Sequence, residues 1–94
     1  MHVIAMSRLR GFWAVHPEAE MSLRTWFKQA TKARWNNLAE LHGQFPSADY
    51  VPPVYTIFDI SHNKYRLITV IDYRLHTVWV HRILTPPEYD RWNP

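Results

Sequence analysis

Cationic and aromatic residues are interleaved in the last third of this 94-residue chain. Lys and Arg side chains neutralise phosphates, and an aromatic ring can stack on an unpaired base. The imidazole of His exchanges a proton near neutral pH. This combination favours an RNA-binding surface that also carries a proton-transfer group. The residues concerned are Lys64, Tyr65, Arg66, Tyr73, Arg74, Trp79, His81 and Arg82.

Strand periodicity divides residues 77–84 between the two faces of a sheet, because residues i and i+2 point to the same side. Val78, Val80, Arg82 and Leu84 form the more aliphatic set and are expected to face the core. Trp79 and His81 then lie on the open face, where they can meet a ligand. The alternative is that His81 is an ordinary surface residue and that Trp79 belongs to a second apolar patch.

Other chemistries lack the residues they need. The chain has no Cys, which excludes a thiolate nucleophile and a cysteine-ligated metal. Its six His show no metal-binding spacing, and its two Gly form no phosphate-binding loop. The pairs Glu18/Glu20 and Glu88/Asp90 are spaced i, i+2, so their carboxylates do not face each other on a helix. We therefore expect no metal, no nucleotide cofactor and no glycosidase pair.

Composition describes a small globular protein with a basic charge. Hydrophobic residues make up 47% and aromatic residues 15% of the chain, which is enough to fill a single core. Eleven Lys and Arg against eight Asp and Glu give a net charge of +3, which favours a polyanionic partner. No apolar run approaches the roughly 20 residues of a membrane span, and no signal peptide is evident. We expect one cytoplasmic domain over residues 1–94 with no membrane association.

The first half of the chain has helical spacing. Leu9 and its neighbours three and four residues on predict a helix over residues 7–16, with Ser7 as its N-cap. Pro17 suits the first position of a second helix. That helix is amphipathic, with Trp26 on its apolar stripe. Its cationic side carries Arg24, Lys28 and Lys32.

A short third helix is expected next, since Asn37 and Glu40 have the spacing of a capping box and Gly43 favours a left-handed helix end. Residues 45–53 include three Pro and are expected to form a loop. The period then changes to two, which predicts strands over residues 54–60, 65–73 and 77–84, joined by short hairpins. Pro86 and Pro87 end the sheet and leave residues 88–92 as a short tail that can form one helical turn.

These elements predict an α+β fold. The three strands form an antiparallel meander, the N-terminal helices pack on one of its faces, and the other face stays partly open. Residues 1–5 are short and compatible with a β-strand, so they are expected to add a strand at one edge of the sheet.

Short motifs follow one another in a fixed order along nearly the whole chain. They are Met1–Ile4, Phe12-Trp13, His16-Pro17, Lys32–Trp35, Phe45–Asp49, Phe58–Ile60, Asn63–Leu67 and Glu88–Asp90. In this order they resemble the HigB family of type II toxin–antitoxin mRNA interferases. The resemblance implies a RelE-like fold, cleavage of messenger RNA on translating ribosomes, inhibition of translation, and a helix-turn-helix antitoxin of the HigA type. It implies no cofactor.

The chain departs from the family pattern at one position. Relatives usually read Thr-His-x-Glu-Tyr-Asp near the end, and here Pro86 stands in place of the His. Three hypotheses therefore remain: an endoribonuclease toxin, a non-catalytic RNA- or ribosome-binding module of the same fold, and an interaction protein whose aromatic surface serves only its partner chain.

If the chain is a ribonuclease, it needs a base for the 2′-OH, cations for the transition-state charge and an acid for the departing 5′-oxygen. No metal is required for these steps. Two residues have an alternative structural interpretation, Lys64 as a solvated hairpin charge and Arg66 as the partner of Asp59 or Asp72. The catalytic candidates are His81, Arg66, Glu88 and Tyr89, and the RNA-binding candidates are Lys64, Arg82, Trp79, Tyr73, Arg24, Lys28 and Lys32.

Overall fold

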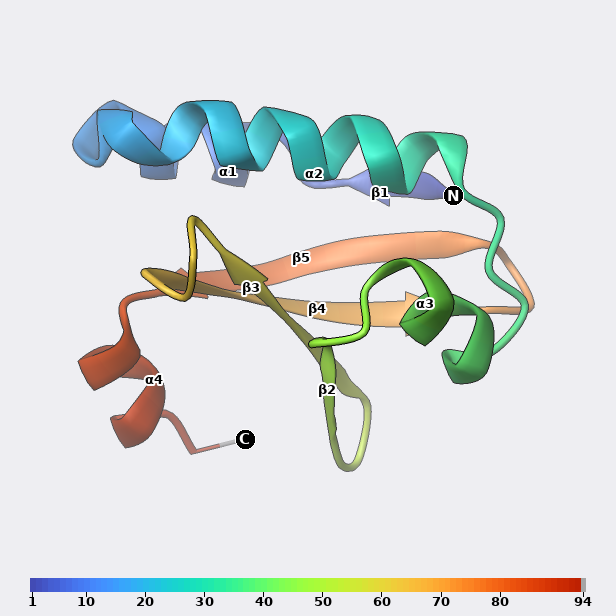
Figure 1. The fold of residues 1–94 in the computed structure, drawn as a ribbon. Helices are drawn as coiled ribbons and strands as arrows, with labels where there is room; N and C mark the ends of the chain where they lie inside the picture. The colour runs from blue at the N-terminus through green and yellow to red at the C-terminus, as the bar shows by residue number, and fades with distance from the viewer. Residues whose placement is uncertain (94) are drawn as a thin grey trace.

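A computed structural model describes residues 1–93 as a five-stranded mixed sheet with helices on both faces (Figure 1). The strand order is β1-β5-β4-β3-β2. The elements in chain order are β1 His2–Ile4, α1 Met6–Val15, the 3₁₀-helix η1 Pro17–Ala19, α2 Glu20–Lys32, α3 Leu38–Gln44, β2 Asp49–Val51, β3 Tyr55–Ile60, β4 Tyr65–Asp72, β5 Thr77–Leu84 and α4 Pro86–Arg91.

Helices α1 and α2 cover one face of the sheet, as the apolar stripes predict. Leu9, Leu23 and Trp26 are buried between these helices and the strands. One detail of the prediction is wrong, because α1 begins at Met6 and Ser7 lies inside the helix instead of at its N-cap. The buried Ala5 is the N-cap position and the only residue between β1 and α1, so the helix starts ahead of Ser7.

Helix α3 begins where the capping pair predicts. The Asn37 side chain accepts a hydrogen bond from the Glu40 backbone N–H at 2.9 Å. Gly43 does not end this helix, which continues to Gln44. The Gln44 side chain accepts a bond from the Trp35 indole N–H at 3.1 Å, a contact with an earlier segment that holds the last turn in place.

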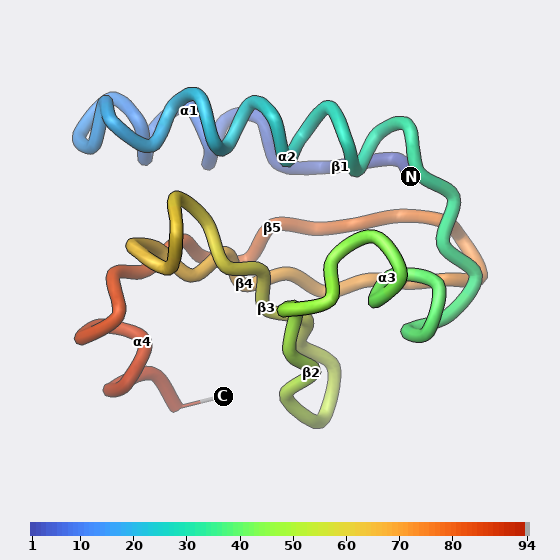
Figure 2. The backbone as a smooth tube through the Cα atoms, viewed as in Figure 1, coloured from blue at the N-terminus to red at the C-terminus, as the bar shows by residue number. Residues whose placement is uncertain are grey.

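The predicted loop over residues 45–53 contains a short strand. Residues of β2 pair antiparallel with β3, Asp49 opposite Ile57 and Val51 opposite Tyr55. A strand of three residues is too short to show the two-residue alternation of buried and exposed side chains. Its pairing with β3 is therefore what defines β2. The predicted edge strand is confirmed as β1, which pairs with β5 in parallel and runs beside it at the N-terminus (Figure 2).

The three long strands and their hairpins are confirmed, and β5 contains a feature that periodicity misses. Ile68 pairs with Arg82, whereas the next residue of β4, Thr69, pairs with Val80. His81 is the extra residue of a β-bulge. One extra residue shifts the in–out alternation of the rest of the strand by one position.

The bulge corrects the predicted faces at the end of β5. Val78 and Val80 belong to the main core as predicted, but beyond the bulge Ile83 packs against that core. Arg82 and Leu84 therefore point to the opposite face. The prediction that they face the core is wrong, because the bulge at His81 shifts the alternation of the residues that follow it.

Helix α4 packs on this opposite face. The ring of Trp92, just after α4, meets Tyr55 edge-on at 5.0 Å. Ile57 and Ile68 are buried on the same side, outside the main core cluster. The face is thus partly open, as expected, with one end covered by the C-terminal segment and Trp79 left 36% exposed.

Candidate functional site

A pocket lies along the last residues of β5. Within residues 1–93, β1 pairs only with residues 77–79 of β5, so the edge beyond them carries no further strand. The open pocket beside this edge has a volume of about 450 Å³. Its lining comes from α1, β5 and α4 and consists of Arg8, Phe12, His81, Arg82, Ile83, Leu84 and Glu88.

The bulge places His81 at this pocket. Its side chain is exposed, and its ring lies 5.5 Å from the ring of Tyr55 on the α4 side of the sheet. Trp79 does not share the pocket, because it borders a separate apolar hollow with Tyr50 and Val54. The structure therefore brings His81 together with Arg82 and separates it from Trp79.

Glu88 forms the α4 wall of the pocket and also caps that helix. One carboxylate oxygen accepts bonds from the backbone N–H and the hydroxyl of Thr85, each at 2.9 Å. The backbone bond is the largest cause that lowers the pKa of Glu88 below 4.5, followed by the hydroxyl bond. Glu88 is thus held as a carboxylate, which makes it a poor proton donor.

Arg66 and Tyr89 lie together on the α4 side of the sheet. The Arg66 guanidinium lies 6.0 Å from the Tyr89 ring centroid, and its Nε is 3.3 Å from Oδ1 of Asp59 on the neighbouring strand. The structural interpretation of Arg66 as a partner of Asp59 is thus confirmed. Burial is the main cause that raises the pKa of Tyr89, with nearby carboxylates adding to it. The phenol therefore stays protonated at neutral pH and can donate a hydrogen bond.

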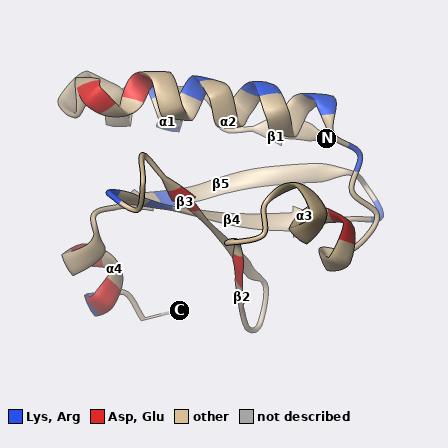
Figure 3. Ribbon diagram, viewed as in Figure 1, with Lys and Arg blue, Asp and Glu red and all other residues tan. Residues whose placement is uncertain are grey.

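The remaining candidates are dispersed. Tyr73 packs against the main core with its hydroxyl oxygen buried, so its geometry favours a structural role over base stacking. Lys64 is exposed in the β3–β4 hairpin. Arg24, Lys28 and Lys32 are exposed on α2, on the other side of the sheet from α4 (Figure 3).

A second hollow of about 460 Å³ lies along α2 at Arg24 and Lys28. Arg24 is already engaged there, since its Nε is 2.7 Å from Glu20 and its guanidinium lies 4.7 Å from the ring of Trp13. No His lines this hollow. Of these two hollows, only the β5 pocket is lined by both cationic side chains and a His.

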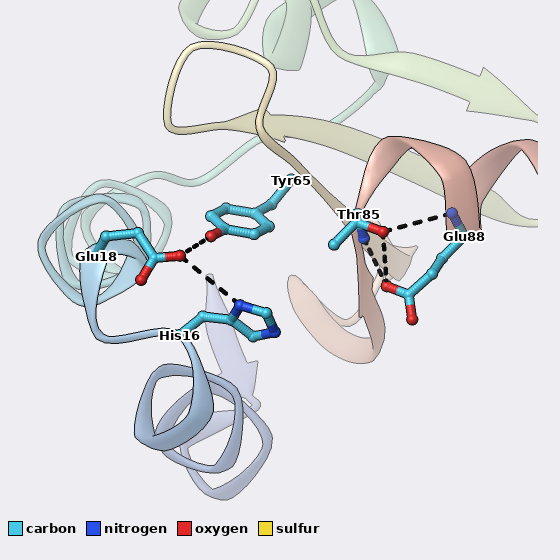
Figure 4. Close-up of polar contacts among 5 residues, drawn as sticks. All are labelled: His16, Glu18, Tyr65, Thr85 and Glu88. Carbon is cyan, nitrogen blue, oxygen red and sulfur yellow. Dashed lines mark hydrogen bonds and ion pairs between the residues drawn. The ribbon is translucent and has the colours of Figure 1, made fainter.

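The structure also assembles a cluster that the sequence did not indicate. The Tyr65 hydroxyl donates a hydrogen bond to Oε1 of Glu18, and Nδ1 of His16 lies 3.7 Å from the same oxygen (Figure 4). The sequence placed His16 on a helical stripe and Glu18 at a helix start. Tyr65 is 47 residues beyond Glu18, so no local spacing could have paired them.

A comparison with protein-family models identifies the fold. A model described as HigB_toxin, the RelE-like toxic component of a toxin–antitoxin system, matches residues 19–92. The chain belongs to this family. It has the α+β RelE-like architecture, here with β1 and β2 extending the three-stranded meander on both sides. No curated protein matches the chain significantly.

Membership of the HigB toxin family implies an antitoxin as partner. In this HigB-family toxin, Pro86 is the first residue of α4, where a missing backbone N–H costs nothing. Thr85 and Glu88 complete a capping box around it. Residue 86 therefore starts the helix and has no side chain that can exchange a proton.

None of the helices within residues 1–93 is long and apolar enough to cross a membrane.

The free energy of unfolding should fall as the pH drops below about 4.5. The pKa values of Glu18 and Glu88 lie below this ordinary value, Glu18 chiefly because of the bond from Tyr65. A lowered pKa in the folded state contributes stability above the unfolded pKa and loses it as the pH falls through the folded one. Urea unfolding from neutral to acidic pH measures this. Glu18→Gln and Glu88→Gln should each have a flatter profile than the parent, and parallel profiles would contradict the prediction.

Proposed function

We propose that this HigB-family toxin is a ribosome-associated mRNA endoribonuclease that acts without a metal and inhibits translation in the cytoplasm. The observation that carries the proposal is the β5 pocket, where the β-bulge sets His81 beside the exposed Arg82. An imidazole next to a guanidinium combines proton transfer with stabilisation of phosphate charge. The whole of residues 1–94 is proposed to form this one toxin domain.

The proposed reaction is attack of a ribose 2′-oxygen on the adjacent phosphorus. The 2′-OH gives its proton to a base as the new P–O bond forms, and the 5′-oxygen receives a proton as its bond to phosphorus breaks. The products are a 2′,3′-cyclic phosphate and a 5′-hydroxyl. We assign proton transfer to His81, charge stabilisation to Arg82 and Arg66, and hydrogen-bond donation to Tyr89.

We propose Glu88 as a positioning residue, because its carboxylate is engaged in capping α4. The partner is proposed to be an antitoxin with a helix-turn-helix domain of the HigA type. Pro86 favours one alternative, a module of the same fold that binds RNA or the ribosome without cleaving it.

Induced expression tests the proposal. The toxin is expressed with and without the protein of a neighbouring helix-turn-helix reading frame, and growth and messenger cleavage are read together. Expression alone should arrest growth and cut messages, and co-expression should prevent both. Growth arrest with intact messages would favour the non-catalytic module, and normal growth in both cultures would contradict the toxin assignment.

RNA binding should weaken steeply with salt. Each neutralised phosphate contributes a slope of about 0.7 log units in affinity per decade of salt on single strands. Lys64→Gln, Arg82→Gln and Lys28→Gln should each reduce the slope by about that amount. The measurement is binding of a non-cleavable oligonucleotide at several salt concentrations.

Gln29→Ala, an exposed uncharged position on the same helix as Lys28, is the control and should leave the slope unchanged. An unchanged slope for Lys28→Gln would show that Lys28 contacts no phosphate and that the RNA lies on the β5 side. Salt-independent binding by the parent would exclude phosphate contacts altogether.

A further inference from the structure

His16 follows the last residue of α1 and lies next to Phe12 at the rim of the β5 pocket, outside the residues that line it. Its ring stacks on that of Phe12 at 4.5 Å, and Phe12 lines the pocket together with His81. The ring of Tyr65 meets both of these rings edge-on, 5.1 Å from Phe12 and 5.6 Å from His16, and 36% of the His16 side chain remains exposed. The imidazole is thus held by two aromatic rings and still reaches solvent beside the pocket.

A carboxylate orients this imidazole. Glu18 lies within ion-pair distance of Nδ1, and the buried Tyr65 anchors the same carboxylate to β4. The bond from Tyr65 is the main cause that lowers the pKa of Glu18, so the group is ionised at neutral pH. With the Glu18 carboxylate on the Nδ1 side of the ring, Nε2 is the nitrogen left to exchange a proton with a substrate. Figure 4 shows Nε2 directed away from Glu18, toward the side of Thr85 and Glu88.

Cleavage through the 2′-OH needs two proton-transfer groups, and the pocket lining supplies only one that is free. His81 can serve as a base or an acid. Glu88 is engaged by Thr85 and stays ionised, while Arg8 and Arg82 do not give up a proton in proteins. The second group must therefore come from the rim.

We propose that His16 is the second proton-transfer residue of this pocket and that Glu18 and Tyr65 position it. The inference rests on the proposed ribonuclease function. One imidazole takes the 2′-OH proton as the new P–O bond forms, and the other protonates the 5′-oxygen as the old bond breaks. The net protonation of the pair is unchanged, and no co-reactant is consumed. His16 would thus supply a second imidazole from the end of α1.

Titratable and charged groups from three sides surround His16. Glu18 from η1 and Tyr65 from β4 contact it as described, and Lys64 in the hairpin acts on the Glu18 carboxylate. Glu88 faces it from α4, and the charge of His16 is among the causes that lower the pKa of Glu88. This electrostatic link joins the His16 cluster to the wall of the pocket.

The test is steady-state cleavage of a message on programmed ribosomes across a range of pH. The parent should show a bell-shaped profile of kcat, with one limb for each imidazole. His16→Gln should lower kcat by about 10²–10⁴-fold, leave KM nearly unchanged and remove one limb. His81→Gln should remove the other limb.

Further variants separate proton transfer from a structural role. Glu18→Gln should lower kcat less than His16→Gln, again at nearly constant KM. Free imidazole should restore part of the kcat of His16→Ala, which no merely structural role would allow. His2→Gln is the matched control, because His2 is exposed on β1, and it should behave as the parent. Circular dichroism and Tm check that each variant is folded.

A folded His16→Gln variant with the parental kcat and both limbs overturns this inference and leaves the proposed function intact. The same holds if only KM rises, or if imidazole fails to rescue a folded His16→Ala variant. A parent that cleaves no message at any pH overturns the proposed function and the inference together.

Discussion

Replacing Trp26 with Ala should lower the free energy of unfolding by about 3–5 kcal/mol, a large share of the stability of a small domain. Trp26 is 2% exposed and packs edge-on against Phe58 at 5.4 Å, which ties α2 to β3. Truncation removes these contacts and leaves a cavity that the surrounding helix and strands can fill only partly. Urea unfolding of purified protein measures the loss, and low soluble yield would accompany it.

Two variants show whether burial is the cause. Within residues 1–93 the indole N–H of Trp26 has no hydrogen-bond partner, so Trp26→Phe loses volume but no hydrogen bond and should cost less than Ala. Trp79→Ala removes the same side chain from a position that is 36% exposed and should cost much less. A Trp26→Ala variant that unfolds like the parent would contradict the position of α2 on the sheet.

Replacing His81 with Gln should lower the rate of message cleavage by about 10²–10⁴-fold and barely change the Tm. Gln retains a similar size and hydrogen-bonding capacity but cannot carry a proton at neutral pH. The side chain of His81 is exposed and lies at a bulge, so few packing contacts depend on it. Cleavage on programmed ribosomes and thermal unfolding of the same preparation measure the two effects.

His62→Gln is a suitable control, since His62 is exposed in the β3–β4 hairpin and lies outside the pocket lining. It should retain parental cleavage. A His81→Gln variant as active as the parent would exclude His81 as a proton-transfer residue and direct attention to Arg66 and Tyr89. A parent without detectable cleavage would favour the RNA- or ribosome-binding module, with Pro86 as its distinguishing residue.

Local patterns in the sequence determined most of the secondary structure. Period-two runs predict β3, β4 and β5, and the apolar stripe with Trp26 predicts α2 and its buried side. The Asn37–Glu40 pair locates the start of α3. Each of these signals depends on residues within a few positions of one another, where backbone geometry and side-chain spacing are directly linked. The exposure of His81 was also predicted, from the alternation that places it on the open face.

Only the tertiary structure decided how the pocket is assembled. The bulge at His81 depends on the pairing of β5 with β4, and a single extra residue leaves no mark on a short period-two pattern. Strand β2 exists because β3 pairs with it. The cluster of His16, Glu18 and Tyr65 joins segments 47 residues apart. Contacts between distant segments form because the whole core buries its apolar surface, and no local spacing records which side chains that packing brings together.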